Sequence, residues 1–318
     1  MQTLRLWRGL GLLAVLIALP VTAQPPVTLV LGTATAGGGF EVYGKALAAT
    51  LAAVDPQLVI EPRRTDGSTE NLQRLATGTI DLGLVQGEAA HAAFATDADK
   101  GASLRILAAM YPTAGMFVVR ADSPYRTIED LRGQAVVLGA RGSGLVTLAR
   151  YVIDGIGLDI DRDFVPILLD RAGDGPALLR DGRVAALWGG GSGWPVFNAV
   201  MGAPAGGRFI APDREQIARI RVRYPFLQPQ TLPPGSFAGQ AAALESVGSW
   251  SFILSGDRLP ADVAHRFCHA LYRGQAQLAA RLPQARDTTV ENTVAALPRA
   301  ELLHPGARRC LQEIGVLR

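Results

Sequence analysis

Short runs of aliphatic and β-branched residues alternate along the chain with longer stretches in which apolar residues recur at helical spacing. The run at residues 27–31 ends at Gly32, and residues 40–54 show the helical spacing. The same order repeats, and it predicts strands at residues 58–61, 80–85 and 104–110 and helices at residues 68–76 and 88–95. This alternation is typical of a mostly parallel sheet covered by helices on both faces.

A second series of the same kind begins after the Gly/Pro-bearing segment 111–115. It predicts strands at residues 116–119, 135–138, 165–169 and 184–188 and helices at residues 144–156 and 176–180. Segment 224–239 contains four prolines and no periodicity, and residues 249–254 resemble a strand that returns to the first series. The chain from residue 260 onward is helical, with breaks at Pro283, Pro298 and Pro305.

The two series predict an α/β protein with two lobes, a hinge between them and an interlobe cleft. Lobe 1 is expected to comprise residues 24–119 and 241–318, and lobe 2 residues 120–240. The chain has 318 residues, which exceeds the size at which a single hydrophobic core usually keeps growing and supports two lobes. Because ligands of open α/β sheets bind beyond the carboxyl ends of the strands, site residues are expected in the loops that follow the strands.

The first 23 residues have the pattern of a signal peptide for export. Arg5 and Arg8 precede an apolar run at residues 10–19, and a small-residue site ends at Ala23, after which we expect cleavage. The apolar run is shorter than the roughly 20 residues that a membrane span needs. We therefore expect the mature chain in the periplasm.

Charge and cysteine content narrow the functional classes further. Removal of residues 1–23 takes away two arginines and no acids, so 31 basic and 28 acidic residues become 29 and 28. A nearly neutral chain without a Lys/Arg block is not expected to bind nucleic acid, and no motif calls for a cofactor. Cys268 and Cys310 either form a disulfide, which an oxidising compartment permits, or remain two buried thiols.

The loop after the first strand contains three successive glycines. It begins at Thr33 and passes through Gly38, Gly39 and Phe40 into the predicted helix. Glycines let a ligand approach the backbone closely, and free amides at a helix N-terminus favour an anion such as a carboxylate. The alternative is a turn that only packs strand against helix. Residues 39–46 nearly match a phosphate loop, but an alanine replaces the hydroxyl residue that binds magnesium.

The loops after other strands supply polar candidates. Ser68 either caps the helix that follows it or faces the cleft, and Gln86 directly follows a buried strand. In lobe 2, Arg141 is a candidate for pairing with a carboxylate, although a solvated or lobe-bridging arginine is the alternative. Ser143 and Gly144 follow it, and this small-residue loop mirrors the one in lobe 1.

Two later loops of lobe 2 complete the predicted cleft. Asp174 either accepts a hydrogen bond from an amino group of the ligand or caps the helix after it. Trp188 and Trp194 flank four glycines and a serine. This loop either forms one wall of the binding pocket, or its two indoles belong to the hydrophobic core.

Catalytic and metal interpretations have less support in the sequence. Ser192 lies in a segment that lacks the final glycine of the nucleophile-elbow pattern. His265 and His269 share a helix face, but the glutamate of the zinc-hydrolase motif does not follow His265. We therefore expect no catalytic residue and no metal.

Short motifs recur in a characteristic order over nearly the whole mature sequence. They include LGT at 31–33, GGG at 37–39, GSTEN at 67–71, DLGLVQ at 81–86, GARGSG at 139–144 and LHPGA at 303–307. With these motifs the chain resembles the TAXI family of solute receptors of tripartite (TRAP) transporters. The resemblance implies a periplasmic binding protein fold of type II and closure around a small organic acid or amino acid. It also implies delivery to membrane permease subunits by a monomer or loose dimer.

One position departs from the family pattern. Glu41 stands where the family usually carries a tyrosine beside the ligand. A carboxylate there disfavours a carboxylate ligand and favours a cationic, amino-bearing or amide ligand. Two other classes use the same two-lobed scaffold: an enzyme in which Glu41 is an acid or base opposite Asp174, and a sensor subunit that docks on a membrane kinase.

Overall fold

The computed structural model describes residues 26–98 and 103–318, so the predicted signal peptide lies outside the described residues. Its strands are β1 (Val27–Gly32), β2 (Leu58–Arg63), β3 (Leu82–Val85), β4 (Leu104–Arg120), β5 (Ala135–Ala140), β6 (Val165–Leu169), β7 (Ala186–Gly190), β8 (Gly207–Ile210), β9 (Gln228–Leu232) and β10 (Leu244–Gly256). Its α-helices are α1 (Gly39–Val54), α2 (Ser68–Thr77), α3 (Gly87–Ala98), α4 (Gly144–Gly155), α5 (Gly175–Arg180), α6 (Pro195–Met201), α7 (Arg214–Arg223), α8 (Ala261–Arg281), α9 (Val290–Ala295) and α10 (Pro305–Glu313). No helix in these two ranges is long and apolar enough to cross a membrane.

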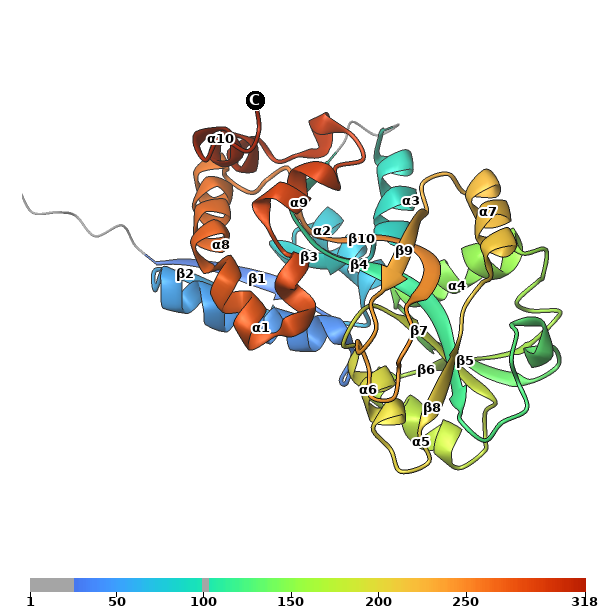
Figure 1. Cartoon of the computed structure of the whole chain (residues 1–318). Coiled ribbons are helices and arrows are strands. Elements are labelled where there is room, and N and C mark those ends of the chain that lie inside the picture. The colour runs from blue at the N-terminus through green and yellow to red at the C-terminus, as the bar shows by residue number, and fades with distance from the viewer. Residues whose placement is uncertain (1–25, 99–102) are drawn as a thin grey trace, which may run out of the picture.

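The strands form a mixed sheet in the order β2-β1-β3-β10-β4-β7-β5-β6, with β8 on β4 and β9 on β10. Each half contains three strands paired in parallel: β1 pairs with β2 and β3, and β5 pairs with β6 and β7. Figure 1 shows the first and last parts of the chain, blue and red, together on one side and the middle, green to yellow, on the other. The predicted α/β fold class is confirmed.

Two long antiparallel strands join the halves. The first part of β4 pairs with β10, and its last residues pair with β7 and β8. The sequence predicts two separate strands here, at residues 104–110 and 116–119, and the structure shows one continuous strand instead. Residues around Pro112 are buried, and Pro112 lies opposite Trp250 where the ladder register shifts, which accommodates a residue without an N–H donor. The predicted lobe boundaries stay a prediction.

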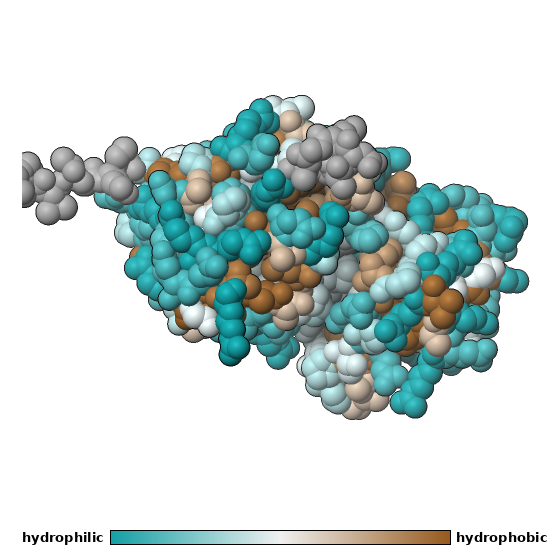
Figure 2. All heavy atoms as spheres, turned by 90° about the horizontal axis from the view of Figure 1, so that it is seen from above, coloured by the Kyte–Doolittle hydropathy of each residue, from teal (hydrophilic) through white to brown (hydrophobic). Residues whose placement is uncertain are grey.

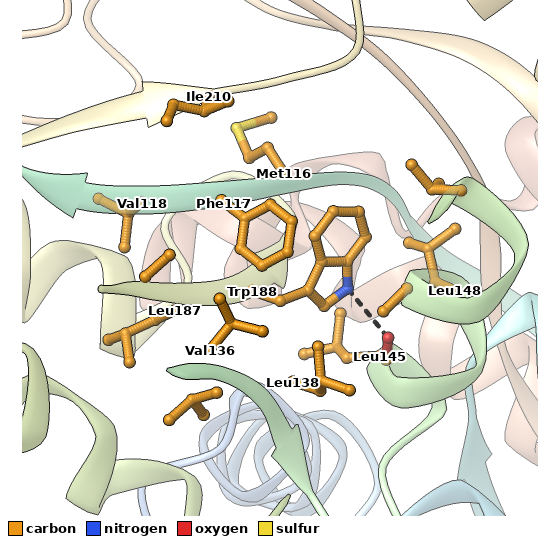
Figure 3. Packing of buried hydrophobic residues seen from close by; sticks show 14 of the residues in the cluster. Met116, Phe117, Val118, Val136, Leu138, Leu145, Leu148, Leu187, Trp188 and Ile210 are labelled. Atoms are coloured by element: carbon orange, nitrogen blue, oxygen red, sulfur yellow. Dashed lines mark hydrogen bonds between the residues drawn. The ribbon is translucent and has the colours of Figure 1, made fainter. Parts of the chain in front are cut away.

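Each half has its own hydrophobic core. In the second half, Trp188 is fully buried, meets Phe117 edge to face at 4.9 Å between ring centroids, and donates a hydrogen bond from Nε1 to the Leu145 carbonyl at 2.9 Å (Figure 3). The first half packs Tyr43 and Leu47 of α1 against the sheet and α8. Viewed from above, hydrophilic residues cover most of the surface (Figure 2).

Several elements between residues 195 and 232 were not expected from the sequence. Helix α7 begins with a capping box in which Asp213 and Gln216 exchange side-chain and backbone hydrogen bonds. Strand β9 lies in the proline-rich segment and pairs with β10 at the side of the sheet, where proline is tolerated. At the C-terminal end, a disulfide between Cys268 and Cys310 joins α8 to α10, which decides between the two alternatives for these cysteines.

Candidate ligand-binding cleft

Loops from both halves surround a cavity of about 50 Å³. It lies beyond the carboxyl ends of β1, β3, β5 and β7, where ligands of open α/β sheets bind. The first half contributes Ala34, Thr35, Gly38, Gly39, Phe40, Asp66, Gly67, Ser68, Gln86, Tyr111, Thr113 and Gln284. The second half contributes Gly139, Ala140, Ser143, Leu145, Ala172, Gly190 and Trp194.

Helix N-termini converge on this cavity. Helices α1, α2 and α4 begin at Gly39, Ser68 and Gly144, and the residue at or just before each start lines the cavity. A helix N-terminus carries a partial positive charge, which favours an anion. The lining residues, all in the described part of the chain, include no Lys, Arg or His. Asp66 adds a carboxylate to the lining, so positive potential at the cavity comes from the helix N-termini and not from a cationic side chain.

The two halves touch each other on both sides of the cavity. The Gly173 amide donates to the Ala36 carbonyl at 3.2 Å, and the Thr69 amide donates to the Gly142 carbonyl at 3.2 Å. Gly37 adopts a φ of +78°, and a Cβ there would lie 2.7 Å from the Gly173 Cα. Glycine is therefore required at this contact by both backbone conformation and space. The structure is a closed form.

Two buried amide side chains line the cavity, and each has one polar atom without a hydrogen-bond partner. Gln86 is 4% exposed and its Nε2 has no hydrogen-bond partner, and Gln284 is 5% exposed and its Oε1 has none, among residues 26–98 and 103–318. Leaving a buried polar group unpaired costs about 1–3 kcal/mol. Because both residues line the cavity, we expect a ligand that offers an acceptor to Gln86 and a donor to Gln284 to recover part of that free energy.

Aromatic side chains close the cavity at one end. The ring of Tyr111 packs edge to face against Phe40 and Tyr43, and burial raises the pKa of the Tyr111 phenol, which therefore stays protonated. Trp194 lies over Gly189, where a Cβ would come within 2.0 Å of the indole. The other edge of this indole faces Gly39 of the opposite half, so Trp194 spans the contact between the halves.

Seven of the predicted site residues line the cavity, and their role in binding stays a prediction. They are Gly38, Gly39, Phe40, Ser68, Gln86, Ser143 and Trp194. The Ser68 Oγ accepts a hydrogen bond from the Gln86 amide at 3.0 Å, and the Ser143 Oγ caps α4 by accepting from Leu145. Ser143 thus caps α4, whereas Ser68 does not cap α2, whose N-cap is Gly67, and instead holds the backbone at Gln86.

Six predicted site residues lie away from the cavity. Trp188 belongs to the core of the second half. Thr33 is buried, and its hydroxyl donates a hydrogen bond to the Arg63 carbonyl. Gly144 packs against Gln86, where a Cβ on Gly144 would lie 2.5 Å from the Gln86 Cβ. Arg141 and Asp174 are solvent-exposed, and Arg141 pairs with Asp170 at 3.2 Å.

Glu41 is the sixth of these residues. Its carboxylate accepts hydrogen bonds from the Gly37 amide at 3.0 Å, from Lys45 at 2.9 Å and from Arg64 at 3.1 Å. The hydrogen bond from Lys45 is the main cause that lowers the pKa of Glu41 to about 2. Lys45 and Arg64 neutralise this carboxylate, and Glu41 does not line the cavity. The structure therefore gives no reason for Glu41 to disfavour a carboxylate ligand. The enzyme alternative also lacks its geometry, because neither Glu41 nor Asp174 lines the cavity.

The sequence analysis missed several lining residues. Thr113 lies in the middle of β4, where the sequence predicted a break rather than a strand, and Gln284 lies on a 3-10 helix (Pro283–Asp287) far from any strand end. Asp66 and Thr35 lie in loops that the analysis had identified, but their side chains carried no distinctive pattern. Only the return of the C-terminal segment to the first half brings Gln284 to the cavity.

A second, larger hollow of about 720 Å³ lies between α3, β10 and residues 295–299. Aromatic and aliphatic side chains make up most of its lining, and the rings of His91 and Phe226 stack there at 4.0 Å. It lacks the converging N-termini of α1, α2 and α4 that surround the smaller cavity. The smaller cavity is therefore the better candidate for a polar ligand.

Comparisons with known proteins agree with this architecture. A protein of Bordetella bronchiseptica RB50 superposes with a TM-score of 0.57 at 12% identity, covering 91% of this chain and 98% of that one. A protein from Methylobacillus flagellatus KT, described as the periplasmic sulfonate-binding protein SsuA, gives a TM-score of 0.50 at 12% identity, with 93% and 89% covered. One from Listeria monocytogenes, described as an L-cystine ABC transporter, gives 0.50 at 12%, with 82% and 98% covered. These likenesses place the fold in the class of type II periplasmic binding proteins.

The chain belongs to the NMT1-like family, which it matches over residues 31–315. The match spans both halves of the sheet and the cleft between them. The resemblance to the TAXI family is not shown by these comparisons and stays a prediction.

Proposed function

We propose that the protein is a periplasmic solute-binding receptor that closes around a small organic acid or amino-acid-like molecule. It would deliver this molecule to a TRAP-type membrane permease. The observation that carries the proposal is the cavity between the halves, where helix N-termini meet the unpaired Gln86 Nε2 and Gln284 Oε1. The lining residues offer hydroxyl and amide groups and the carboxylate of Asp66 but no histidine or cysteine, which supports binding rather than turnover.

The size of the cavity limits the ligand. A cavity of about 150 Å³ holds a benzene molecule, and the cavity here measures about 50 Å³. A ligand of more than a few non-hydrogen atoms therefore requires the halves to separate slightly from the closed form. Such a separation would break the backbone hydrogen bonds between the halves and loosen the packing of Trp194 against Gly39.

The sequence motifs and the structural neighbours favour different types of transporter. The sequence motifs favour a TRAP-type permease, whereas two structural neighbours are described as components of ABC transport. Co-purification of the receptor with membrane subunits from the same organism distinguishes these. Recovery of an ATPase-coupled permease would contradict the TRAP assignment without affecting the receptor function.

The receptor function is tested by native mass spectrometry of the protein purified without denaturation. We expect a bound small molecule, which should stabilise the protein by about 2.7 kcal/mol at one hundred times its dissociation constant. Exchange of Gln86 to Ala should reduce the amount of co-purified molecule, and exchange of the exposed Gln73 to Ala is the matched control. If no molecule co-purifies and no carboxylate, sulfonate or amino acid raises the melting temperature, the proposal is wrong.

A further inference from the structure

Two histidines and a glutamate converge on one point at the C-terminal end of the fold, away from the cleft. His265 and His269 lie one turn apart on α8, and Glu313 lies at the end of α10. The Glu313 Oε2 lies 2.7 Å from the His265 Nε2 and 2.9 Å from the His269 Nε2. Each of the three offers one ligand atom within 4.8 Å of the other two.

The residue types and spacing match the requirements of a divalent transition metal. Imidazole nitrogen and carboxylate oxygen are the ligands that zinc takes at about 2.0–2.2 Å. Residues four apart on a helix share a face, so His265 and His269 reach a common ion without any backbone change. Tetrahedral coordination needs ligand atoms roughly 3.3 Å apart at these bond lengths. Glu313, whose side chain is 48% exposed, can rotate to supply the small opening.

The disulfide between Cys268 and Cys310 fixes the two helices beside this point. Cys268 lies between the histidines in sequence, and Cys310 lies one turn before Glu313. The covalent bond therefore holds the third ligand opposite the first two before any ion arrives. Ligands held in this way lose less conformational freedom on binding than ligands on separate segments.

Neighbouring charges allow a cation here. Arg309 lies beside the site, with its Nε 4.0 Å from the Glu313 Oε1, and its guanidinium pairs with Asp262 at 2.9 Å. The positive charge of Arg309 is thus balanced by an acid of its own.

We propose that His265, His269 and Glu313 form a surface site for a single zinc-type divalent ion, with solvent in the remaining coordination position. Bound there, the ion would join α8 to α10 in parallel with the disulfide. Imidazole ligands suit zinc, copper and nickel, and a single carboxylate makes the site a poor one for calcium or magnesium. The site is separate from the cleft, since none of its residues lines the cavity.

The test is calorimetric titration of the tag-free mature protein with zinc chloride. We expect one ion per chain, with affinity reduced at least tenfold in His269→Ala and in Glu313→Gln. Glu313→Gln changes a half-exposed side chain, so a folding defect does not confuse the result. His91→Ala, which removes a histidine at the distant aromatic stack, should bind zinc as the unchanged protein does.

Cobalt(II) provides a second readout, because a site with nitrogen and oxygen ligands shows visible absorption bands that depend on its coordination. The bands should appear with the unchanged protein and disappear in His269→Ala. No saturable zinc binding up to millimolar concentration, or binding that both variants retain in full, would overturn the proposal and leave the three residues as an ion pair only.

Discussion

Gln86 shows how a single residue supports binding at the expense of stability. It is buried, its backbone is fixed by Ser68, and its Nε2 is left unpaired in the closed structure. We expect Gln86→Ala to weaken ligand binding by about 5- to 150-fold, the loss of about 1–3 kcal/mol for a buried hydrogen bond. The ligand-free variant should be at least as stable as the unchanged protein, because an unpaired polar atom is removed.

Isothermal titration with the co-purified molecule measures the first effect, and urea unfolding of the ligand-free protein measures the second. Gln73→Ala should change neither, since Gln73 is exposed on the same half. Unchanged affinity in Gln86→Ala would show that the Gln86 amide does not contact the ligand.

Glu88 is a buried carboxyl group beside the cleft whose titration should affect stability. Burial raises its pKa to about 7, and its Oε1 accepts a hydrogen bond from the Ser249 Oγ at 2.8 Å. The folded state therefore binds a proton more tightly than the unfolded state, in which the pKa is about 4.3. Stability from this group is present below that value and is lost as the pH rises to about 7.

Replacement Glu88→Gln should remove this pH dependence, since the amide stays neutral and its oxygen still accepts from Ser249. Relative to the variant, the unchanged protein should lose on the order of 3 kcal/mol of unfolding free energy between pH 4.5 and 8, the equivalent of the pKa shift. Urea unfolding of both proteins across this range measures the difference. A constant difference at all pH values would contradict the assignment.

At the scale of elements, the sequence predicted those with a strong local pattern. The apolar spacing and glycine ends of α1, α2 and α4 match the observed helices to within a few residues. Strand β4 was split incorrectly at Pro112, because its continuity depends on pairing with β10 rather than on local preference. Strand β9 was missed for the same reason, since its partner is a distant strand.

The helix pair α8 and α10 is expected to depend on its disulfide. The bond closes a loop with a sequence separation of 42, which in the chain-entropy treatment corresponds to about 4 kcal/mol. Reduction with dithiothreitol should therefore lower the unfolding free energy by about 2–4 kcal/mol. In the Cys268→Ala/Cys310→Ala double variant, dithiothreitol should have no effect. An equal effect on both proteins would mean that the reductant acts elsewhere.

At the scale of the whole molecule, the α/β order of the sequence predicted where the site loops lie. It predicted only some of the residues that line the cavity. The glycine loops at Gly38 and Ser143 lie at carboxyl ends of parallel strands, which the sequence pattern indicates. Gln284 and Tyr111 reach the cavity only because the C-terminal segment and the long strand β4 return there. Arg141 was expected at the ligand from charge alone, and its pairing with Asp170 at the surface could not be read from sequence.

The central claim is that the two halves close around one small molecule, and an interlobe distance tests it most directly. Spin labels at Gln73→Cys and Arg162→Cys lie on exposed positions of opposite halves, and the native cysteines are held in their disulfide. Double electron–electron resonance should show a broad distribution without ligand and a shorter, narrower one with the molecule recovered from native purification. An identical distribution in both states, with the molecule demonstrably bound, would contradict the account.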